Sequence, residues 1–210
     1  MASKTGQTAA TKGRKFPAEP LTVDEVEKLI AAVGGNGPIA VRNRALISLI
    51  WRSGLRISEA LSLRPSDVEA GKINVRHGKG AKQRIAYYDS LAVGYLSAWE
   101  TVRATLGVNG RQPLFCSVSH GDQRAPGARI DPAYVRQLLP RLAKHAGIHK
   151  RVHAHGLRHT HASELALERL RISSIAAQLG HGSTATTDAY LKKITAGDLA
   201  DDMAAIGRTV

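Results

Sequence analysis

Residues 155–159 read His155-Gly156-Leu157-Arg158-His159, and Leu179-Gly180-His181 and Tyr190 follow in the same C-terminal part of the chain. Helical turns at this spacing can bring an arginine, two imidazoles and a phenol together. A guanidinium offers a planar fork of donors for phosphate oxygens, and an imidazole can move protons near neutral pH. A tyrosine hydroxyl can be a covalent nucleophile once its proton is removed. The stretch therefore indicates chemistry on a phosphodiester.

The charge of the chain is its most unusual bulk property. Its 210 residues hold 30 Lys and Arg against 17 Asp and Glu, a net charge of +13. The first 20 residues hold four of these cations and one anion, so a net charge of +10 remains for the rest. This excess is typical of a protein with a polyanionic partner and favours a basic groove over a basic tail.

Several classes of protein are disfavoured by composition. Cys116 is the only cysteine, so an internal disulfide cannot form and a reducing compartment fits. The sequence has no apolar run of the roughly 18 residues that span a bilayer, and its polar start lacks the apolar core of a signal peptide. Without a long amphipathic basic helix, membrane-surface binding is also disfavoured. We therefore expect a cytoplasmic protein.

Amphipathic patterns predict a mostly helical chain. Thr22 and Glu25 have the spacing of a capping box before a first helix, and Asp131-Pro132 is a typical helix start. A short helix is expected to end near Leu63. The other expected helices cover 39–52, 90–106, 132–146, 156–169, 173–179, 184–191 and 196–206. Residues 1–20 are expected to form a disordered basic arm.

The clear β pattern lies between residues 72 and 88. Ile73 and Val75 precede the small-residue turn 77–82, and Ile85 and Tyr87 follow it. One more short strand is expected near residues 114–116. The predicted fold class is therefore mostly α with a small β-hairpin, an α+β fold.

Two groups of cations precede the C-terminal motifs. Arg56 stands at a helix start, where free N–H groups favour anions, and Glu59 lies on the same face. A surface Arg–Glu pair is the common explanation of this spacing, but the apolar surroundings imply that Arg56 is partly buried and needs a partner. Lys79 can reach outward from its glycine-flanked turn, and Lys82 competes with it for that role.

The histidines invite a test for a metal site. His153, His155, His159 and His161 include one pair at the spacing of a helical zinc site. Cysteine and carboxylate ligands are scarce nearby, and no glutamate follows His155 as an H-E-x-x-H site requires. We expect neither a metal site nor a cofactor, and we expect His153 and His161 to be core or surface histidines. Tyr190 alone would be explained as an amphipathic helix residue.

The order of these signals resembles the catalytic domain of the tyrosine recombinases, the phage integrase family. The similarity runs from Gly54-Leu55-Arg56-Ile57-Ser58-Glu59-Ala60-Leu61-Ser62-Leu63 through the Lys79 turn to Tyr190, within residues 21–194. It implies that Arg56 and Arg158 bind phosphate, that Glu59 supports Arg56, and that Tyr190 is the nucleophile. It also implies catalytic roles for Lys79, His155 and His181. It further implies DNA binding by Lys82 and Arg84, and association with the nucleoid in a prokaryotic host.

The resemblance implies metal-independent cleavage and rejoining of double-stranded DNA through a 3′-phosphotyrosyl intermediate, with Tyr190 deprotonated by His155 and the leaving oxygen protonated by Lys79. It further implies a monomer in solution that forms a tetramer on paired sites, with residues 195–210 exchanged as a helix between protomers. Two features depart from the family: only about twenty residues stand where a helical clamp domain usually lies, and residues 168–171 lack the usual glycine.

Three other functions share some of these features. A type IB topoisomerase-like enzyme would relax supercoils without strand exchange. A non-catalytic DNA-binding protein would use the basic groove without needing Tyr190. A zinc-dependent hydrolase would lose its activity to a chelator.

Overall fold

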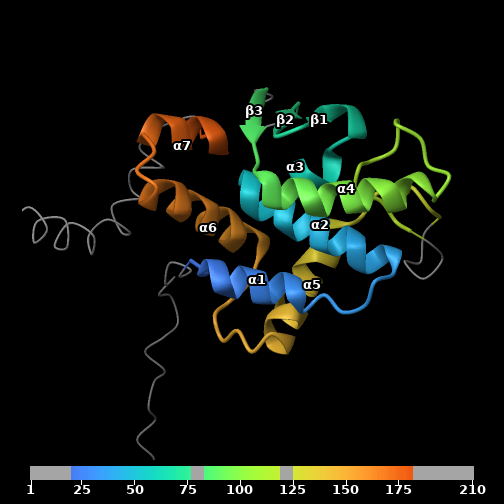
Figure 1. Ribbon diagram of the computed structural model, residues 1–210, viewed down its shortest axis with the longest axis horizontal. Helices are drawn as coiled ribbons and strands as arrows, with labels where there is room; N and C mark the ends of the chain where they lie inside the picture. The colour runs from blue at the N-terminus through green and yellow to red at the C-terminus, as the bar shows by residue number, and fades with distance from the viewer. Residues whose placement is uncertain (1–19, 77–82, 119–124, 182–210) are drawn as a thin grey trace, which may run out of the picture.

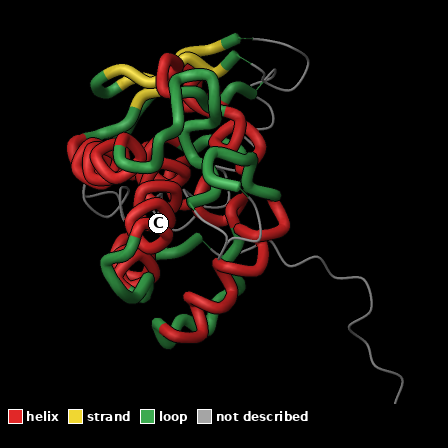
Figure 2. The backbone as a smooth tube through the Cα atoms, turned by 90° about the vertical axis from the view of Figure 1, so that its right-hand side faces the viewer, coloured by secondary structure: helices red, strands yellow, loops and turns green. Residues whose placement is uncertain are grey.

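The computed structural model describes residues 20–76, 83–118 and 125–181. In these ranges the chain forms a body of helices with a small sheet along one edge (Figures 1 and 2). The fold class predicted from the sequence is confirmed. The elements are α1 (Val23–Ala31), α2 (Pro38–Ser53), α3 (Ile57–Ser62), the 3-10 turn η1 (Pro65–Asp67), β1 (Val68–Glu69), β2 (Lys72–Val75), β3 (Arg84–Tyr87), α4 (Ser90–Ala104), α5 (Pro132–His145), α6 (Ala154–Leu167) and α7 (Ile172–Leu179).

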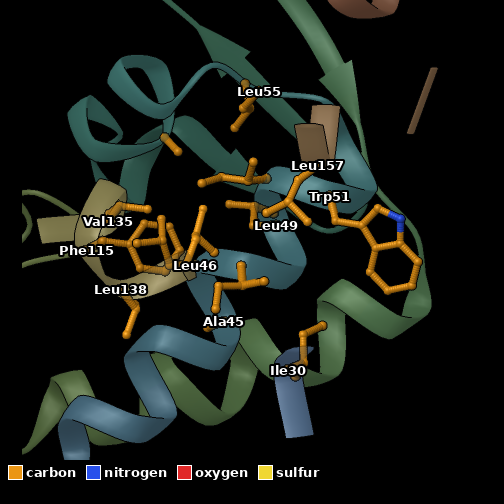
Figure 3. Close-up of a cluster of buried hydrophobic side chains, with 14 of the residues drawn as sticks. Ile30, Ala45, Leu46, Leu49, Trp51, Leu55, Phe115, Val135, Leu138 and Leu157 are labelled. Atoms are coloured by element: carbon orange, nitrogen blue, oxygen red, sulfur yellow. The ribbon is translucent and has the colours of Figure 1, made fainter. Parts of the chain in front are cut away.

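Helix α2 forms the centre of the core. It begins with Pro38 at its first turn, where a missing N–H costs nothing, and it packs against α1, α3, α4 and α6. Leu46, Leu49 and Trp51 of α2 are buried. Figure 3 shows these side chains beside Phe115 and Leu157, which come from later segments. Each such side chain contributes about 2 kcal/mol through burial. Polar residues of α2 are buried as well, and Arg42 donates a hydrogen bond of 3.0 Å from Nη1 to Cys116 O.

The sheet is antiparallel in the order β1–β2–β3, with Ile73 opposite Ala86 in the β2–β3 pair. Side chains alternate across it, so Ile73 and Ala86 are buried while Tyr87 is exposed. The predicted hairpin is confirmed. Strand β1 was not predicted because two residues are too few to show an alternating pattern. The strand expected near 114–116 is a single bridge between Cys116 and Arg129.

The helices agree with the sequence prediction to within two residues at each end. The largest shift is in α6, which begins at Ala154 because the His153 side chain caps it: His153 Nδ1 accepts a hydrogen bond of 2.7 Å from the Gly156 amide. The helices predicted over 184–191 and 196–206, and all but the last residue of the predicted N-terminal arm, lie outside the described residues. No helix in the described ranges is long and apolar enough to cross a membrane.

Helix α6 ends without glycine in a turn that usually contains it. The Arg169 amide donates to Ala166 O at 2.9 Å and the Leu170 amide donates to Leu165 O at 3.0 Å, which is the Schellman pattern. This pattern needs a left-handed residue, and Arg169 takes it with φ 61°. A side chain in that conformation costs about 1 kcal/mol. Arg169 thus takes the position that glycine usually occupies in this motif, and the turn geometry is kept.

Glycine and alanine at position 169 should therefore differ in stability. Both variants lose the arginine side chain, so their difference isolates the backbone. We expect Arg169→Gly to be more stable than Arg169→Ala by about 1 kcal/mol in urea denaturation. As a control, Ala177→Gly inside α7 should destabilise the protein by about 1 kcal/mol. A more stable alanine variant at 169 would show that Arg169 is unstrained.

Candidate active site

The Gly54-Leu55-Arg56 segment connects α2 to α3. Gly54 has φ 63°, and a Cβ there would lie 2.7 Å from both the His161 and Leu179 side chains. Glycine is thus required for the backbone to turn and for α6 and α7 to approach it. Leu55 is buried, and Arg56 follows as the residue before α3. The core therefore fixes where the Arg56 side chain begins.

Glu59 binds Arg56 from one turn further along α3. The Arg56 amide donates to Glu59 Oε2 at 2.9 Å, and Arg56 Nη1 donates to Glu59 Oε1 at 2.7 Å. The Arg56 side chain is 29% exposed and that of Glu59 is 2% exposed. The sequence prediction of a partly buried Arg56 with a carboxylate partner is confirmed.

Arg84, at the start of β3, is a second partner of Glu59. Its Nη1 and Nη2 atoms donate to the two Glu59 carboxylate oxygens, each at 2.9 Å. Burial alone would raise the pKa of Glu59, but hydrogen bonds from Arg84 and from the Arg56 amide outweigh it and lower the pKa to about 2. The carboxylate is therefore ionised throughout the physiological range. This buried role of Arg84 was not predicted from the sequence, and a DNA contact by Arg84 stays a prediction.

Arg158 joins the three motifs that the sequence separates. Its side chain, buried on α6, donates from Nη1 to Gly54 O and from Nη2 to Leu179 O, both at 2.6 Å. Burial, followed by the charge of Arg56, lowers the pKa of Arg158 to about 10. The guanidinium is therefore still charged at neutral pH, and two backbone carbonyls hold its position.

Helix α7 is held against β3 by Gln178. Its amide Nε2 donates to Tyr87 O at 2.7 Å and its Oε1 accepts from the Tyr87 amide at 3.0 Å, so the side chain pairs with the backbone of β3. Nε2 also contacts Ser53 O at 3.2 Å. Arg84 Nε donates to Gln178 O at 3.2 Å, and Gly180 leaves the space that the Arg84 side chain fills. His181 follows this clamped helix end directly. A single glutamine in an amphipathic helix gives no sequence signal of such a role.

Three histidines lie around the arginines. His155 is exposed on α6, and its ring centroid is 4.1 Å from that of half-buried His159 in an edge-on arrangement. Burial, followed by the charges of Arg158, His153 and Arg56, lowers the pKa of His155. Burial, followed by the charges of Arg158 and Arg56, lowers the pKa of His181 to about 4. Both imidazoles are therefore mostly neutral at pH 7, and both lie close enough to the two arginines to feel their charge.

The other two histidines of the cluster have structural positions, as expected. His153 caps α6, and His161 is buried against Gly54. Burial, followed by the charge of Arg52, lowers the pKa of His161 to about 4. Within the described ranges, no group of three or more His, Cys, Asp or Glu side chains could hold a metal ion. Tyr190, Lys79 and Lys82 lie outside the described residues.

The structure thus brings Arg56, Arg158, His155 and His181 together from three separate segments. Charged guanidinium groups can hold phosphate oxygens, and neutral imidazoles can accept a proton or donate a hydrogen bond. The buried Glu59 offsets part of the positive charge without facing outward. These side chains can therefore bind a negatively charged group such as a phosphate and stabilise the additional negative charge that develops on it in a transition state.

A sequence model of the phage integrase family matches residues 19–196, and the chain belongs to this family. Tyrosine recombinase XerD of Mycobacterium leprae is 37% identical over 185 residues, which cover 86% of this chain and 58% of that protein. Tyrosine recombinase XerC of Thermodesulfovibrio yellowstonii is 34% identical over 172 residues, covering 81% of this chain and 56% of that one. The chain thus spans less than three fifths of the length of these relatives.

Solved structures agree with this assignment. The crystal structure of XerA recombinase matches with a TM-score of 0.73 and 30% identity, covering 88% of this chain and 66% of that one. A post-cleavage complex of the XerH site-specific recombinase with a palindromic difH substrate matches with a TM-score of 0.69 and 29% identity, covering 85% and 50%. The catalytic domain of bacteriophage HP1 integrase shares the fold, with a TM-score of 0.55 at 20% identity over 83% of this chain and 88% of that one.

Removing the charge of Glu59 should destabilise the whole site. In Glu59→Gln, two guanidinium groups would share a neutral amide, and the uncompensated charge should cost about 3 kcal/mol in urea denaturation. Glu69→Gln is the matched control, because Glu69 pairs with Lys72 on the surface with both side chains about half exposed. That control should change stability by less than about 0.5 kcal/mol. If the two substitutions lowered the free energy of unfolding equally, Glu59 would be no more important to stability than a surface carboxylate.

The lowered histidine pKa values make stability depend on pH. As the pH falls from about 6.5, the ordinary histidine pKa, towards about 4, the unfolded chain binds protons that folded His159, His161 and His181 do not bind. The free energy of unfolding should therefore fall across this window. His161→Phe removes one such site, so its urea stability should fall less steeply between pH 7 and pH 4.5. An unchanged slope in the variant would remove His161 as a source of the effect.

Proposed function

We propose that this chain cleaves and rejoins DNA strands as the catalytic part of a tyrosine site-specific recombinase, with residues 21–194 as its catalytic domain. The strongest support is the placement of Arg56, Arg158, His155 and His181 around one position. The family match and the relatives named tyrosine recombinases support the same reaction class.

The reaction exchanges one phosphoester for another. The hydroxyl oxygen of Tyr190 attacks the scissile phosphorus and forms a new P–O bond, while the bond to the 5′ oxygen breaks. The products are a 3′-phosphotyrosyl link and a free 5′-hydroxyl. Attack by a 5′-hydroxyl reverses the step and releases Tyr190. Because a phosphoester is retained throughout, rejoining needs no ATP.

The two arginines stabilise the charge that develops on the non-bridging oxygens. A guanidinium has five N–H donors, and Arg158 uses two of them on Gly54 O and Leu179 O among the described residues. The carbonyls therefore fix the plane of the group while the other N–H groups serve the phosphate. Arg56 is held by the Glu59 carboxylate instead, through Nη1 and the backbone amide. Removing one such donor typically lowers the rate about 10²–10³-fold.

Proton transfer is assigned to the neutral groups of the site and to Lys79. His155 is mostly neutral at pH 7 because its pKa is lowered, so it can accept the proton that Tyr190 loses. His181 can donate a hydrogen bond to a non-bridging oxygen. Lys79 gives a proton to the departing 5′ oxygen, and Lys82 adds a further phosphate contact. All of these are side chains of the protein, and the mechanism uses no metal.

The nucleophile can be tested by trapping the covalent intermediate. On a library of nicked duplexes with randomised sequence, the released short strand diffuses away and the adduct persists in SDS. We expect wild-type protein to form such an adduct in EDTA, and mass spectrometry to place the nucleotide on Tyr190. Tyr190→Phe should bind the same DNA and form no adduct, because only a hydroxyl is lost. An adduct in the variant, or a strict need for a metal ion, would contradict the mechanism.

We further propose that the protein is a monomer in solution and forms a tetramer on paired DNA sites in the cytoplasm, on the nucleoid. Residues 196–206 carry an apolar stripe of Leu199, Met203 and Ile206 at helical spacing, which a neighbouring protomer could bury. Deleting residues 196–210 should leave single-site binding intact and abolish slower-migrating assemblies on native gels with paired sites. Normal assembly by the truncated chain would refute the exchange.

A further inference from the structure

Helix α7, which leads to His181, is joined to the rest of the protein by a small apolar cluster. The buried members of this cluster are Ala162, Ile175 and Leu179, and the cluster is separate from the much larger main core. Apolar burial is non-directional, so a cluster of this size holds α7 near α6 without fixing where the helix lies along its other neighbour, β3. Polar contacts are needed to fix that position.

The side chain of Gln178 provides directional contacts of this kind. Strand β3 is the last strand in the order β1–β2–β3, and α7 lies beside it (Figure 1). The Tyr87 amide donates to Gln178 Oε1 at 3.0 Å, and the Tyr87 carbonyl accepts from Gln178 Nε2 at 2.7 Å. The side-chain amide therefore pairs with Tyr87 as a residue of a neighbouring strand would. Because both backbone groups of Tyr87 take part, the pairing fixes the orientation of the amide as well as its distance from β3.

Two further acceptors lie near the same amide nitrogen. Gln178 Nε2 is 3.2 Å from Ser53 O and 3.3 Å from His161 Nε2. Burial, followed by the charge of Arg52, lowers the pKa of His161 to about 4, so the ring is neutral at pH 7 and can accept through Nε2 when Nδ1 carries the proton. The amide of Gln178 thus contacts the end of α2 and α6 in addition to β3.

A rigid turn connects Gln178 to His181. Gly180 has φ 65°, and the His181 amide donates to Ala176 O at 3.0 Å, which closes the end of α7 in a Schellman-type turn. Burial, followed by the charge of Arg158, lowers the pKa of His181 to about 4, so its imidazole lies near that guanidinium. A displacement of the last turn of α7 would therefore move His181 relative to Arg158.

We propose that Gln178 is a positioning residue that aligns the His181 imidazole with the phosphate held by Arg56 and Arg158. The inference rests on the proposed function, because it takes that phosphate as the reacting group. Gln178 does not touch the reacting atoms. Its amide sets where the last turn of α7 lies along β3, and the rigid turn passes this position on to His181. A misplacement of about 1 Å can lower a reaction rate about 10²-fold, so such a contact matters to the rate.

Two substitutions separate the amide from the bulk of the side chain. Gln178→Met keeps the length and removes the amide, and Gln178→Glu keeps the shape and removes both N–H groups. The probe is the pool of nicked duplexes that wild-type protein traps as the covalent adduct. At saturating protein and about pH 8, both variants should cleave at least about tenfold more slowly in a single turnover, with a Kd within about twofold of wild type. Gln137→Met, at an exposed position on α5, is the matched control and should change neither value.

The pH profile shows whether the pairing with Tyr87 sets the rate. A protonated carboxyl group has one donor and one acceptor oxygen, so it can pair with both backbone groups of Tyr87 as the amide does. In Gln178→Glu the surrounding carbonyls raise the pKa of the introduced group. Its rate deficit, relative to wild type at the same pH, should therefore shrink at least about threefold between about pH 8 and pH 5.5. The deficit of Gln178→Met should stay constant. Equal profiles for the two variants would overturn the proposal.

A double-mutant cycle shows whether the effect passes through His181. In a His181→Ala background, Gln178→Met should lower the cleavage rate by less than about twofold further, because the group that it positions is already gone. A general loss of structure would lower the rate by the same factor in both backgrounds. The full tenfold loss in the His181→Ala background would therefore refute a positioning role.

The wild-type protein separates failure of this inference from failure of the proposed function. If wild-type protein forms no covalent adduct, the proposed function fails and the inference fails with it. If wild-type protein cleaves and Gln178→Met cleaves at the same rate, the inference fails alone. Melting temperatures are measured first, and if Gln178→Met is unfolded at the assay temperature, the pH profile of Gln178→Glu decides the question.

Discussion

The buried carboxylate of Glu59 is the interaction on which the candidate site depends. Arg56, Arg84 and Arg158 are close enough to influence one another and the neighbouring histidines electrostatically, and three such cations would repel each other. Glu59 accepts from Arg56 and, through both of its oxygens, from Arg84. Its pKa of about 2 means that the compensating charge persists at any physiological pH. The Glu59 carboxylate thus allows Arg56, just before α3, and Arg84, at the start of β3, to lie close together in spite of their like charges.

The remaining constraint comes from backbone carbonyls. Arg158 donates to Gly54 O and Leu179 O, while Arg84 donates to Gln178 O, so the end of α7 is held by two arginines. Helix C-termini leave such carbonyls without intrahelical partners and carry partial negative charge, which makes them good acceptors for cations. Gly54 and Gly180 are needed where side chains from other segments come close. The residues of the sequence motifs therefore hold the segments together as well as supplying the chemical groups of the site.

Much of the site could be predicted from the sequence because its motifs combine chemistry with local structure. Arg56 with Glu59 one turn later, and His155 with Arg158 on one helix, follow from spacing alone. The second partner of Glu59 could not be predicted, because Arg84 is 25 residues away and reaches it through sheet packing. Gln178 pairs with β3 through its side chain, and a side chain that imitates a strand leaves no periodic pattern. Strand β1 is too short to show a periodic pattern, and the left-handed Arg169 could not be predicted because arginine rarely takes that conformation.

We propose that Arg158, fixed by two carbonyls, stabilises the transition state more than it binds the ground state. The most direct measurement is single-turnover cleavage by Arg158→Lys at saturating concentrations of a nicked duplex that wild-type protein traps. Lysine keeps the charge but not the planar fork of donors. We expect a Kd within a few-fold of wild type and a cleavage rate about 10²-fold lower. A variant that cleaves at the wild-type rate, or one that loses only affinity, would contradict it.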